Sequence, residues 1–241
     1  MTVKEHYENH LAKFYSWMTG DFESNQNEFQ NFLTDNNILP VSSKNAIDLG
    51  AGHGIQSVSL SKLGFSVTAV DFSKLLLEEL KVNSAGRHID ILEGDIKNVK
   101  QFSDKRPELI ICCGDTISHL ENKNEIKNFL KDISDTLIKG GKALLSFRDY
   151  SLALTGDDRF LQVKSDDSRI LTCVLEYEID YVRVTDLLYE KSDAGWNKKV
   201  SSYKKVRIKT AEITEQLESC NLKIQLNNIV KGMTTLLAIK K

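Results

Sequence analysis

The sequence is poor in the residues that mark disulfide-rich and metal-binding proteins. It contains four cysteines and two prolines in 241 residues, and no pair of cysteines has C-x-x-C spacing. Cys112 and Cys113 are adjacent inside an apolar run, which is typical of small buried side chains in a reducing compartment. We therefore expect no disulfide framework and no metal site, and the scarcity of proline favours one compact body.

Long apolar runs and a strong net charge are also missing. No run reaches the roughly 18 apolar residues of a membrane-spanning helix, and residues 1–10 lack the apolar segment of a signal peptide. The sequence therefore predicts a cytoplasmic protein without a membrane partner. The formal net charge of -2 gives no long-range attraction for polyanions, so we expect no nucleic-acid partner.

One cluster of basic residues near the end of the chain is an exception to this nearly neutral charge. We interpret it as a solvated strand face, and binding of RNA or another macromolecule is the alternative. Its members are Lys198, Lys199, Lys204, Lys205, Arg207 and Lys209.

Short apolar segments alternate with amphipathic ones between residues 44 and 150. The clearest helical pattern covers 123–138, and Gly140 and Gly141 follow it as a stop signal. Such alternation predicts a parallel sheet with helices on both faces. The expected strands are 45–49, 66–70, 89–93, 109–113 and 142–147.

The pattern differs on either side of this region. Residues 2–37 carry two apolar helical stripes. After residue 150, period-2 alternation without helices predicts an antiparallel sheet inserted after the fifth strand. The later segments are the strands 169–177, 181–190 and 198–208, the helix 210–220 and an antiparallel pair at 223–230 and 234–239. We interpret the chain as a single α/β domain with a helical cap at 1–43, a cofactor-binding core at 44–150, a β insertion at 151–209, and a closing helix and β-hairpin at 210–241.

The strongest local motif follows the first expected strand. Asp48 precedes glycines at 50, 52 and 54, and a helical pattern comes next. Glycines allow a sharp turn close to a ligand, and a helix N-terminus offers free N–H groups. The spacing is tighter than in the dinucleotide fingerprint, and the Asp48 carboxylate would repel a pyrophosphate. The motif therefore favours a zwitterionic ligand over a nicotinamide or flavin cofactor.

Acidic residues also follow the next strands. Asp71 is placed to accept ribose hydroxyls, and Asp95 is placed to accept an adenine amino hydrogen while Ile96 packs on the ring. Gly114 and Asp115 follow the fourth strand. The carboxyl ends of parallel strands meet at one edge, where open α/β sheets bind ligands. The alternative is a set of purely structural turns and helix caps.

With these motifs, residues 46–150 resemble class I S-adenosylmethionine-dependent methyltransferases. The resemblance implies a Rossmann-like, mostly parallel seven-stranded sheet whose last strand is antiparallel. It also implies S-adenosylmethionine as cofactor and S-adenosylhomocysteine as product. Tyr15 and Trp17 are expected to close over the cofactor, or else to pack in the core. The implied cofactor-binding residues are Asp48, Gly50, Ala51, Gly52, Gly54, Asp71, Phe72, Ser73, Gly94, Asp95, Ile96, Cys113, Gly114, Asp115, Tyr15 and Trp17.

Missing motifs narrow the acceptor class. Methyltransferases of nucleic-acid amines resemble one another in an Asp/Asn-Pro-Pro-aromatic motif after the fourth strand, and cytosine C5 enzymes carry Pro-Cys. This chain has neither. Residues 113–120 instead resemble small-molecule N-methyltransferases, including the glycine and sarcosine group. We expect methyl transfer to a small amine, carboxylate or hydroxyl. The alternatives are cofactor binding without turnover and methylation of RNA or protein.

Three residues near the expected cleft are our catalytic candidates. His119 acts as a general base or bonds to backbone, Arg148 holds a substrate carboxylate or pairs with Asp149, and Tyr150 contributes a hydroxyl. Asp115 and Asp149 as Mg²⁺ ligands are a further alternative, which the Arg148 cation disfavours. We expect the N-terminal helices and the β insertion to form the acceptor pocket, in a monomer or homodimer.

Overall fold

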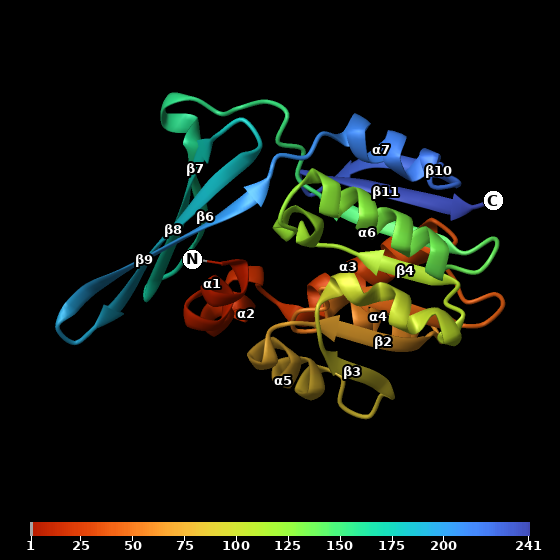
Figure 1. Cartoon of the computed structure of the whole chain (residues 1–241). Coiled ribbons are helices and arrows are strands. Elements are labelled where there is room, and N and C mark those ends of the chain that lie inside the picture. The colour runs from red at the N-terminus through yellow and green to blue at the C-terminus, as the bar shows by residue number, and fades with distance from the viewer. Residues whose placement is uncertain (1) are drawn as a thin grey trace.

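The computed structural model describes residues 2–241 and contains two sheets (Figure 1). The larger sheet has seven strands in the order β10-β11-β5-β4-β1-β2-β3. Strands β1 to β5 pair in parallel, whereas β11 is antiparallel to both of its neighbours. The strands are β1 Asn45–Leu49, β2 Ser66–Asp71, β3 Ile89–Glu93, β4 Leu109–Cys112, β5 Lys142–Phe147, β10 Leu222–Val230 and β11 Met233–Lys240. This topology confirms the expected sheet with its last strand antiparallel.

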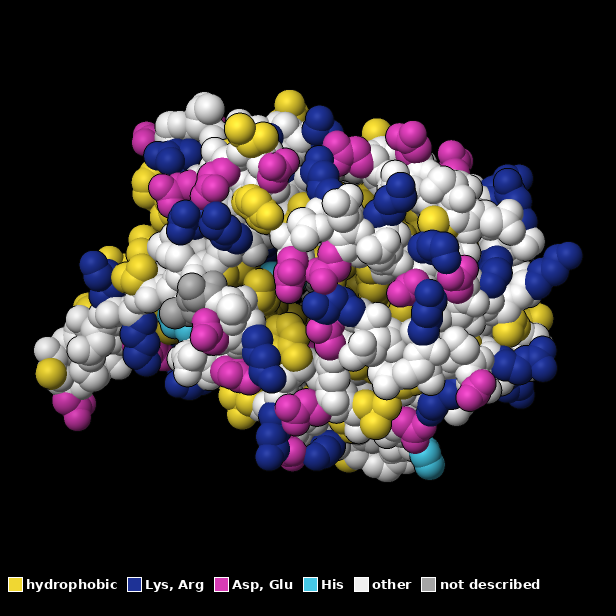
Figure 2. Space-filling view, viewed as in Figure 1, with side chains coloured by type: hydrophobic (Ala, Val, Ile, Leu, Met, Phe, Trp, Pro, Cys, Tyr) yellow, Lys and Arg dark blue, Asp and Glu magenta, His cyan; other side chains and the backbone are white. Residues whose placement is uncertain are grey.

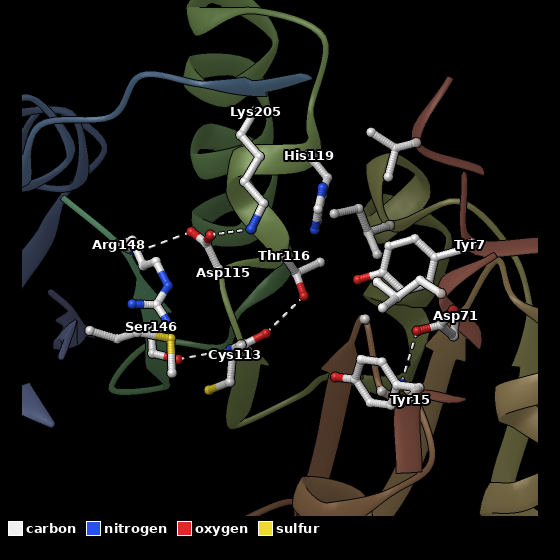
Figure 3. A pocket seen from close by; sticks show the side chains of 18 of the residues that line it. Tyr7, Tyr15, Asp71, Cys113, Asp115, Thr116, His119, Ser146, Arg148 and Lys205 are labelled. Atoms are coloured by element: carbon white, nitrogen blue, oxygen red, sulfur yellow. Dashed lines mark hydrogen bonds and ion pairs between the residues drawn. The ribbon is translucent and has the colours of Figure 1, made fainter. Parts of the chain in front are cut away.

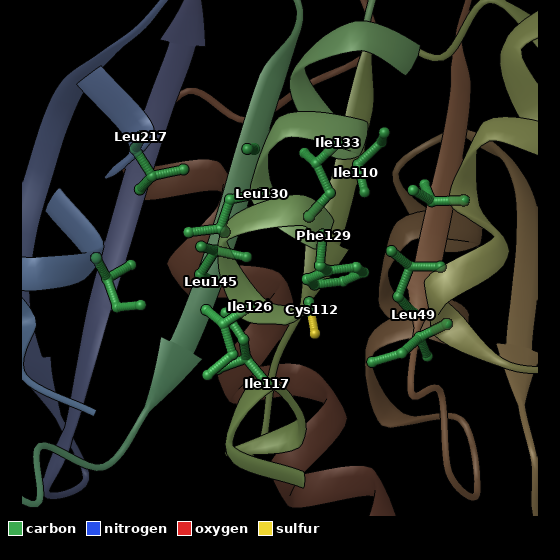
Figure 4. Close-up of a cluster of buried hydrophobic side chains, with 14 of the residues drawn as sticks. Leu49, Ile110, Cys112, Ile117, Ile126, Phe129, Leu130, Ile133, Leu145 and Leu217 are labelled. Atoms are coloured by element: carbon green, nitrogen blue, oxygen red, sulfur yellow. The ribbon is translucent and has the colours of Figure 1, made fainter. Parts of the chain in front are cut away.

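Helices cover both faces of the large sheet. On one face, Phe129 and Leu130 pack with Leu217 against the buried strand residues Ile110 and Leu145 (Figure 4). Burial of such side chains contributes roughly 1.5–3 kcal/mol each. The helices of the core are α3 Phe22–Asp35, α4 Ile55–Lys62, α5 Lys74–Asn83, α6 Lys123–Thr136 and α7 Thr210–Ser219.

The insertion forms a separate four-stranded antiparallel sheet that projects beside the core (Figure 1). The alternation predicts three of its strands and misses the first, because nearly all side chains of that strand are exposed and leave no period-2 signal. In the order of the sheet, the strands are β6 Phe160–Ser165, β7 Arg169–Tyr177, β8 Tyr181–Ser192 and β9 Gly195–Val206.

The N-terminal segment lies between the two sheets and is more broken than expected. The first of the two expected helices is divided into α1 Val3–Asn9, a 3₁₀ turn at Leu11–Phe14 and α2 Tyr15–Thr19. The break allows Leu11 and Phe14 to pack against Leu171 and Leu188 of the insertion. Within residues 2–241, every helix is too short or too polar to span a bilayer.

Candidate active site

A cavity of about 1500 Å³ lies at the carboxyl ends of the strands of the large sheet. Its walls come from the loops after β1 to β5, from the N-terminal helices and from the insertion. In the space-filling view the surface is hollowed between the insertion and the core, and hydrophobic side chains show inside (Figure 2). One drug-sized ligand fills roughly 300–1,000 Å³, so this cavity has room for a cofactor and an acceptor.

The glycine loop after β1 forms one end of the cavity. Gly50 has a φ of +79°, and a Cβ there would lie 2.5 Å from Cγ2 of Thr116, so only glycine fits. The N–H groups of Gly50 and Ala51 donate to the Val70 carbonyl at 2.8 and 3.1 Å, which holds the loop against β2. Gly50, Ala51 and Gly52 line the cavity.

Asp71, at the end of β2, faces this loop (Figure 3). Its Oδ2 accepts the Gly52 N–H at 2.9 Å, and its Oδ1 accepts the Ser73 N–H at 2.8 Å. Burial raises the pKa of Asp71, although both N–H groups favour the ionised form. A carboxylate offers about four acceptor positions, so positions remain for ribose hydroxyls. The loop and this acid therefore fit S-adenosylmethionine.

The segment after β3 continues the same wall. Asp95 Oδ1 accepts the Lys97 N–H at 2.9 Å and so caps the 3₁₀ helix Ile96–Lys105. Asp95 nevertheless lines the cavity, together with Phe72, Gly94 and Ile96. Capping and ligand binding are compatible here because the cap uses only one acceptor position of the carboxylate.

Four of the expected cofactor residues do not line the cavity. Asp48 is buried behind the loop, where it accepts a hydrogen bond from Ser57 Oγ at 2.6 Å. Burial raises the pKa of Asp48 to about 7. Gly54 and Ser73 cap the N-termini of α4 and α5, and Trp17 donates to an acid of the insertion. In this structure these four residues therefore support the loop, the two helix ends and the N-terminal segment rather than the wall of the cavity.

Asp115 lies where the cavity meets the insertion, in a turn with a φ of 70° after β4. Its Oδ1 accepts the Arg148 N–H at 3.0 Å (Figure 3). Its Oδ2 accepts the Tyr150 hydroxyl at 2.8 Å and the Lys205 ammonium at 2.6 Å. Burial raises the pKa of Asp115, but the Lys205 ammonium outweighs it, and the pKa is lowered overall. Asp115 thus lines the cavity and is the centre of a polar network, and its assignment to the cofactor stays a prediction.

The structure also decides the two interpretations of His119. Its ring lies edge-on to Tyr7, with centroids 5.7 Å apart, and 5.6 Å from the Tyr203 ring. Its Nδ1 is buried without a hydrogen-bond partner among the described residues, so it makes no backbone bond there. Burial and the Lys205 ammonium lower the pKa of His119 to about 3. The imidazole is therefore neutral at pH 7 and faces the cavity.

Arg148 lines the cavity, and within residues 2–241 its guanidinium makes no hydrogen bond or ion pair. It does not pair with Asp149, whose carboxylate accepts the N–H groups of Ser151 and Thr210, both at 2.8 Å. Asp115 and Asp149 thus belong to separate networks, which argues against a shared Mg²⁺ site. Across residues 2–241, no group of three or more His, Cys, Asp or Glu side chains is placed to hold a metal ion.

Sequence analysis missed Lys205 as a cavity residue. It assigned Lys205 to a solvated face with its basic neighbours, and Lys199 is indeed exposed. The Lys205 side chain is only 11% exposed because it points inward with Tyr203. Tyr203 and Lys205 lie on the same face of β9, but Lys199 has the same parity and is exposed, so strand alternation by itself gives no signal. Tyr7, from α1, is a second missed lining residue.

Comparisons with known proteins agree with this geometry. Residues 46–141 match the family model described as a methyltransferase domain. The glycine N-methyltransferase of Oryctolagus cuniculus is 25% identical over 166 residues, which are 63% of this chain and 56% of that protein. This chain thus spans little more than half the length of that relative.

Two solved structures share the fold over most of the chain. The S-adenosylmethionine-dependent methyltransferase of Clostridium acetobutylicum ATCC 824 has a TM-score of 0.72 at 20% identity, covering 92% of each chain. The S-adenosylmethionine-bound amino pentose methyltransferase of calicheamicin biosynthesis, from Micromonospora echinaspora, has a TM-score of 0.71 at 12% identity, again covering 92% of each. The chain therefore carries a region similar to a methyltransferase domain and shares the fold of these S-adenosylmethionine-dependent methyltransferases, as its glycine loop predicts.

Proposed function

We propose that this chain transfers a methyl group from S-adenosylmethionine to a small-molecule acceptor with an amine, carboxylate or hydroxyl. One observation carries the proposal: a single cavity is lined both by the glycine loop with Asp71 and by Asp115, Arg148, Tyr150 and Lys205, the group of residues that we assign to the acceptor end. The relative that acts on glycine and the neighbour named for an amino pentose support an amine as the methylated group.

The residues of the cofactor end bind and orient. Asp71 accepts the ribose hydroxyls, Asp95 accepts from the adenine amino group, and Phe72 and Ile96 pack beside the ring. When bound, S-adenosylmethionine would supply a methyl group: its bond to sulfur would break with the electron pair left on sulfur, the bond to the acceptor would form, and the acceptor's proton would pass to solvent. The protein chiefly aligns the two reactants.

The residues of the acceptor end position the nucleophile and exclude water. His119 is neutral and too weakly basic to hold a proton at pH 7, so we assign it a hydrogen bond that orients the acceptor amine or hydroxyl. The Tyr150 hydroxyl is committed to Asp115, and burial raises the pKa of Tyr150. Tyr150 is therefore a positioning residue rather than a base. Tyr7 and Tyr203 close the wall around His119.

We further propose that the acceptor is not a nucleic acid. Acidic and basic side chains are interspersed on the face that carries the opening (Figure 2). In the basic cluster, Lys199 pairs with Glu190 and Lys204 with Glu178, while Lys205 turns inward. A cytoplasmic location, a monomeric or dimeric state and the four-part division of the chain remain predictions.

A turnover screen tests this function. Release of S-adenosylhomocysteine is measured over amines, carboxylates, phenols and thiols. On the acceptor that emerges, His119→Ala should lower turnover by roughly 10²-fold, with cofactor affinity near wild type. Asp71→Ala should weaken cofactor affinity and spare turnover at saturating cofactor and acceptor. If the folded protein does not bind S-adenosylhomocysteine in calorimetry, the proposed cofactor is wrong and the proposed function fails with it.

A further inference from the structure

Asp186, on β8, is a buried carboxylate in the wall of the cavity and takes no part in the function proposed above. The residue is 2% exposed, and its Oδ1 accepts a hydrogen bond from the Cys173 thiol at 3.0 Å. His6 Nε2 lies 3.2 Å from its Oδ2, but this nitrogen makes no hydrogen bond within residues 2–241. A thiol is a weak donor, and a carboxylate has about four acceptor positions. Asp186 therefore has unused capacity to accept hydrogen bonds.

The other two buried acids of the cavity wall are better satisfied. Asp71 accepts two backbone N–H groups. Asp115 accepts a backbone N–H, the Tyr150 hydroxyl and the Lys205 ammonium. Removing a carboxylate from water is costly unless a cation or several donors compensate it. Asp186 is therefore the acid of this wall that gains most from a donor on a ligand.

The two cations of the acceptor end do not compensate Asp186. The Lys205 ammonium pairs with Asp115, and within residues 2–241 the Arg148 guanidinium makes no hydrogen bond or ion pair. Lys205 and Arg148 are matched in number by Asp115 and Asp186, so the charges of this group balance. The position next to Asp186 is thus open to a cationic group of a ligand.

Apolar neighbours would strengthen such an ion pair. Val184 and Leu188 precede and follow Asp186 on the same face of β8, and both are buried. Charges interact more strongly where little water surrounds them. An ammonium bound at Asp186 would therefore interact with the carboxylate more strongly than it would at the protein surface.

Asp186 and His119 lie at separate points of the cavity wall. The His6 ring, next to Asp186, stacks on Tyr203 with centroids 4.1 Å apart, and the His119 ring lies 5.6 Å from the other ring, that of Tyr203. Asp186 and His119 are thus linked through two intervening rings, and within residues 2–241 no hydrogen bond or ion pair joins them. A ligand group at His119 and one at Asp186 are therefore different groups.

Resting on the proposed function, we infer that Asp186 binds an ammonium group of the acceptor that is not the group methylated. A nearby carboxylate favours the charged form of an amine, and an ammonium nitrogen has no lone pair with which to attack the methyl group. The methylated amine or hydroxyl lies by His119 instead. The acceptor class is therefore a small cation with a second, nucleophilic group, such as a diamine or an amino alcohol.

Calorimetry on the full chain, saturated with S-adenosylhomocysteine, tests the inference with two probes of matched size. Benzylamine is an ammonium at pH 7, and benzyl alcohol is neutral. We expect benzylamine to bind about 10-fold tighter, since a charge-assisted hydrogen bond is stronger than a neutral one. Equal binding of the two probes overturns the inference.

Three variants assign the preference to Asp186. Asp186→Asn keeps the size of the side chain and removes its charge, and it should abolish the preference for benzylamine. Asp186→Glu keeps the charge and should keep most of the preference. Glu176→Gln removes an acid of the same sheet at a side chain that is 53% exposed, and it should change nothing. A preference that survives Asp186→Asn contradicts the inference.

Two further results distinguish this role from others. If Asp186 only anchors α1 through His6, Asp186→Asn lowers the midpoint of urea unfolding and leaves the preference for benzylamine unchanged, which contradicts the inference. A loss of S-adenosylhomocysteine affinity of about 10-fold in Asp186→Asn also contradicts it, because the carboxylate would then hold the ammonium of the cofactor. These readouts are binding constants and unfolding midpoints, so an absence of turnover counts against the proposed function alone.

Discussion

The two ends of the cavity are built in opposite ways. The cofactor end is local: each of its acids follows a strand directly, and the loop after β1 bonds to the end of β2. The acceptor end joins distant segments, since Lys205 of β9 meets Asp115 across 90 residues. Local geometry makes the first end a property of the fold class. The second end depends on how the insertion docks, and this allows its chemistry to vary while the cofactor stays the same.

The largest expected effect is a loss of stability when the ion pair between Lys205 and Asp115 is removed. Lys205→Met leaves Asp115 buried and uncompensated, which should cost about 3–5 kcal/mol of unfolding free energy. The exposed pair of Lys123 and Glu212, with side chains 45% and 40% exposed, is the control. Lys123→Met should cost less than about 1 kcal/mol. Urea unfolding measures both, and equal costs would show that the Lys205 pair contributes no more than a surface pair.

The second prediction concerns Asp71, at the cofactor end of the cavity. Asp71→Ala should weaken S-adenosylhomocysteine binding by about 1.5–3 kcal/mol, because hydrogen bonds to a charged acceptor are lost. Asp90→Ala removes an acid that pairs with Lys105 outside the cavity, and should leave affinity unchanged. Calorimetry measures the S-adenosylhomocysteine affinity of both variants. A similar loss of affinity in each would indicate a general effect of removing a negative charge.

The third prediction concerns the acid behind the glycine loop. Burial raises the folded-state pKa of Asp48 from its ordinary value of 3.8 to about 7, so folding favours the protonated form. Its contribution to stability is present below about pH 4 and is lost as pH rises through about 7. The side chain in Asp48→Asn cannot ionise. Between pH 4 and 8 the free energy of unfolding of this variant should therefore fall by less than that of the wild type, with a difference on the order of 1–2 kcal/mol. Unfolding curves at several pH values test this, and identical slopes would contradict it.

The smallest expected effect is on cofactor affinity, and it should differ between Tyr15 and Trp17, two aromatic residues of α2. Tyr15 lines the cavity, whereas Trp17 hydrogen-bonds Asp166 and stacks near Arg169 of the insertion. Tyr15→Ala should weaken S-adenosylhomocysteine binding by roughly 1 kcal/mol, and Trp17→Ala should not change it. If Trp17→Ala weakens binding as much as Tyr15→Ala, the original assignment of Trp17 to the cofactor is restored.

The sequence by itself determined the large sheet and most of the cofactor end. Short apolar runs predicted β1 to β5. A strand buried on both faces needs such a run, as β1, β2, β4 and β5 show, whereas the edge strand β3 is only half-buried. The glycine spacing and the acids at 71 and 95 followed from short-range geometry, since a strand end and the next turn lie within a few residues of each other.

Only the tertiary structure decided the acceptor end. The same strand carries the exposed Lys199 and the inward Lys205, and no local pattern of charges tells them apart. Within residues 2–241 the Arg148 guanidinium has no hydrogen-bond or ion-pair partner, and the neighbouring Asp149 instead bonds to Thr210, which lies 61 residues away. Whether a charge is solvated, paired or free depends on which elements pack against it, and that is fixed by contacts between segments far apart in the chain.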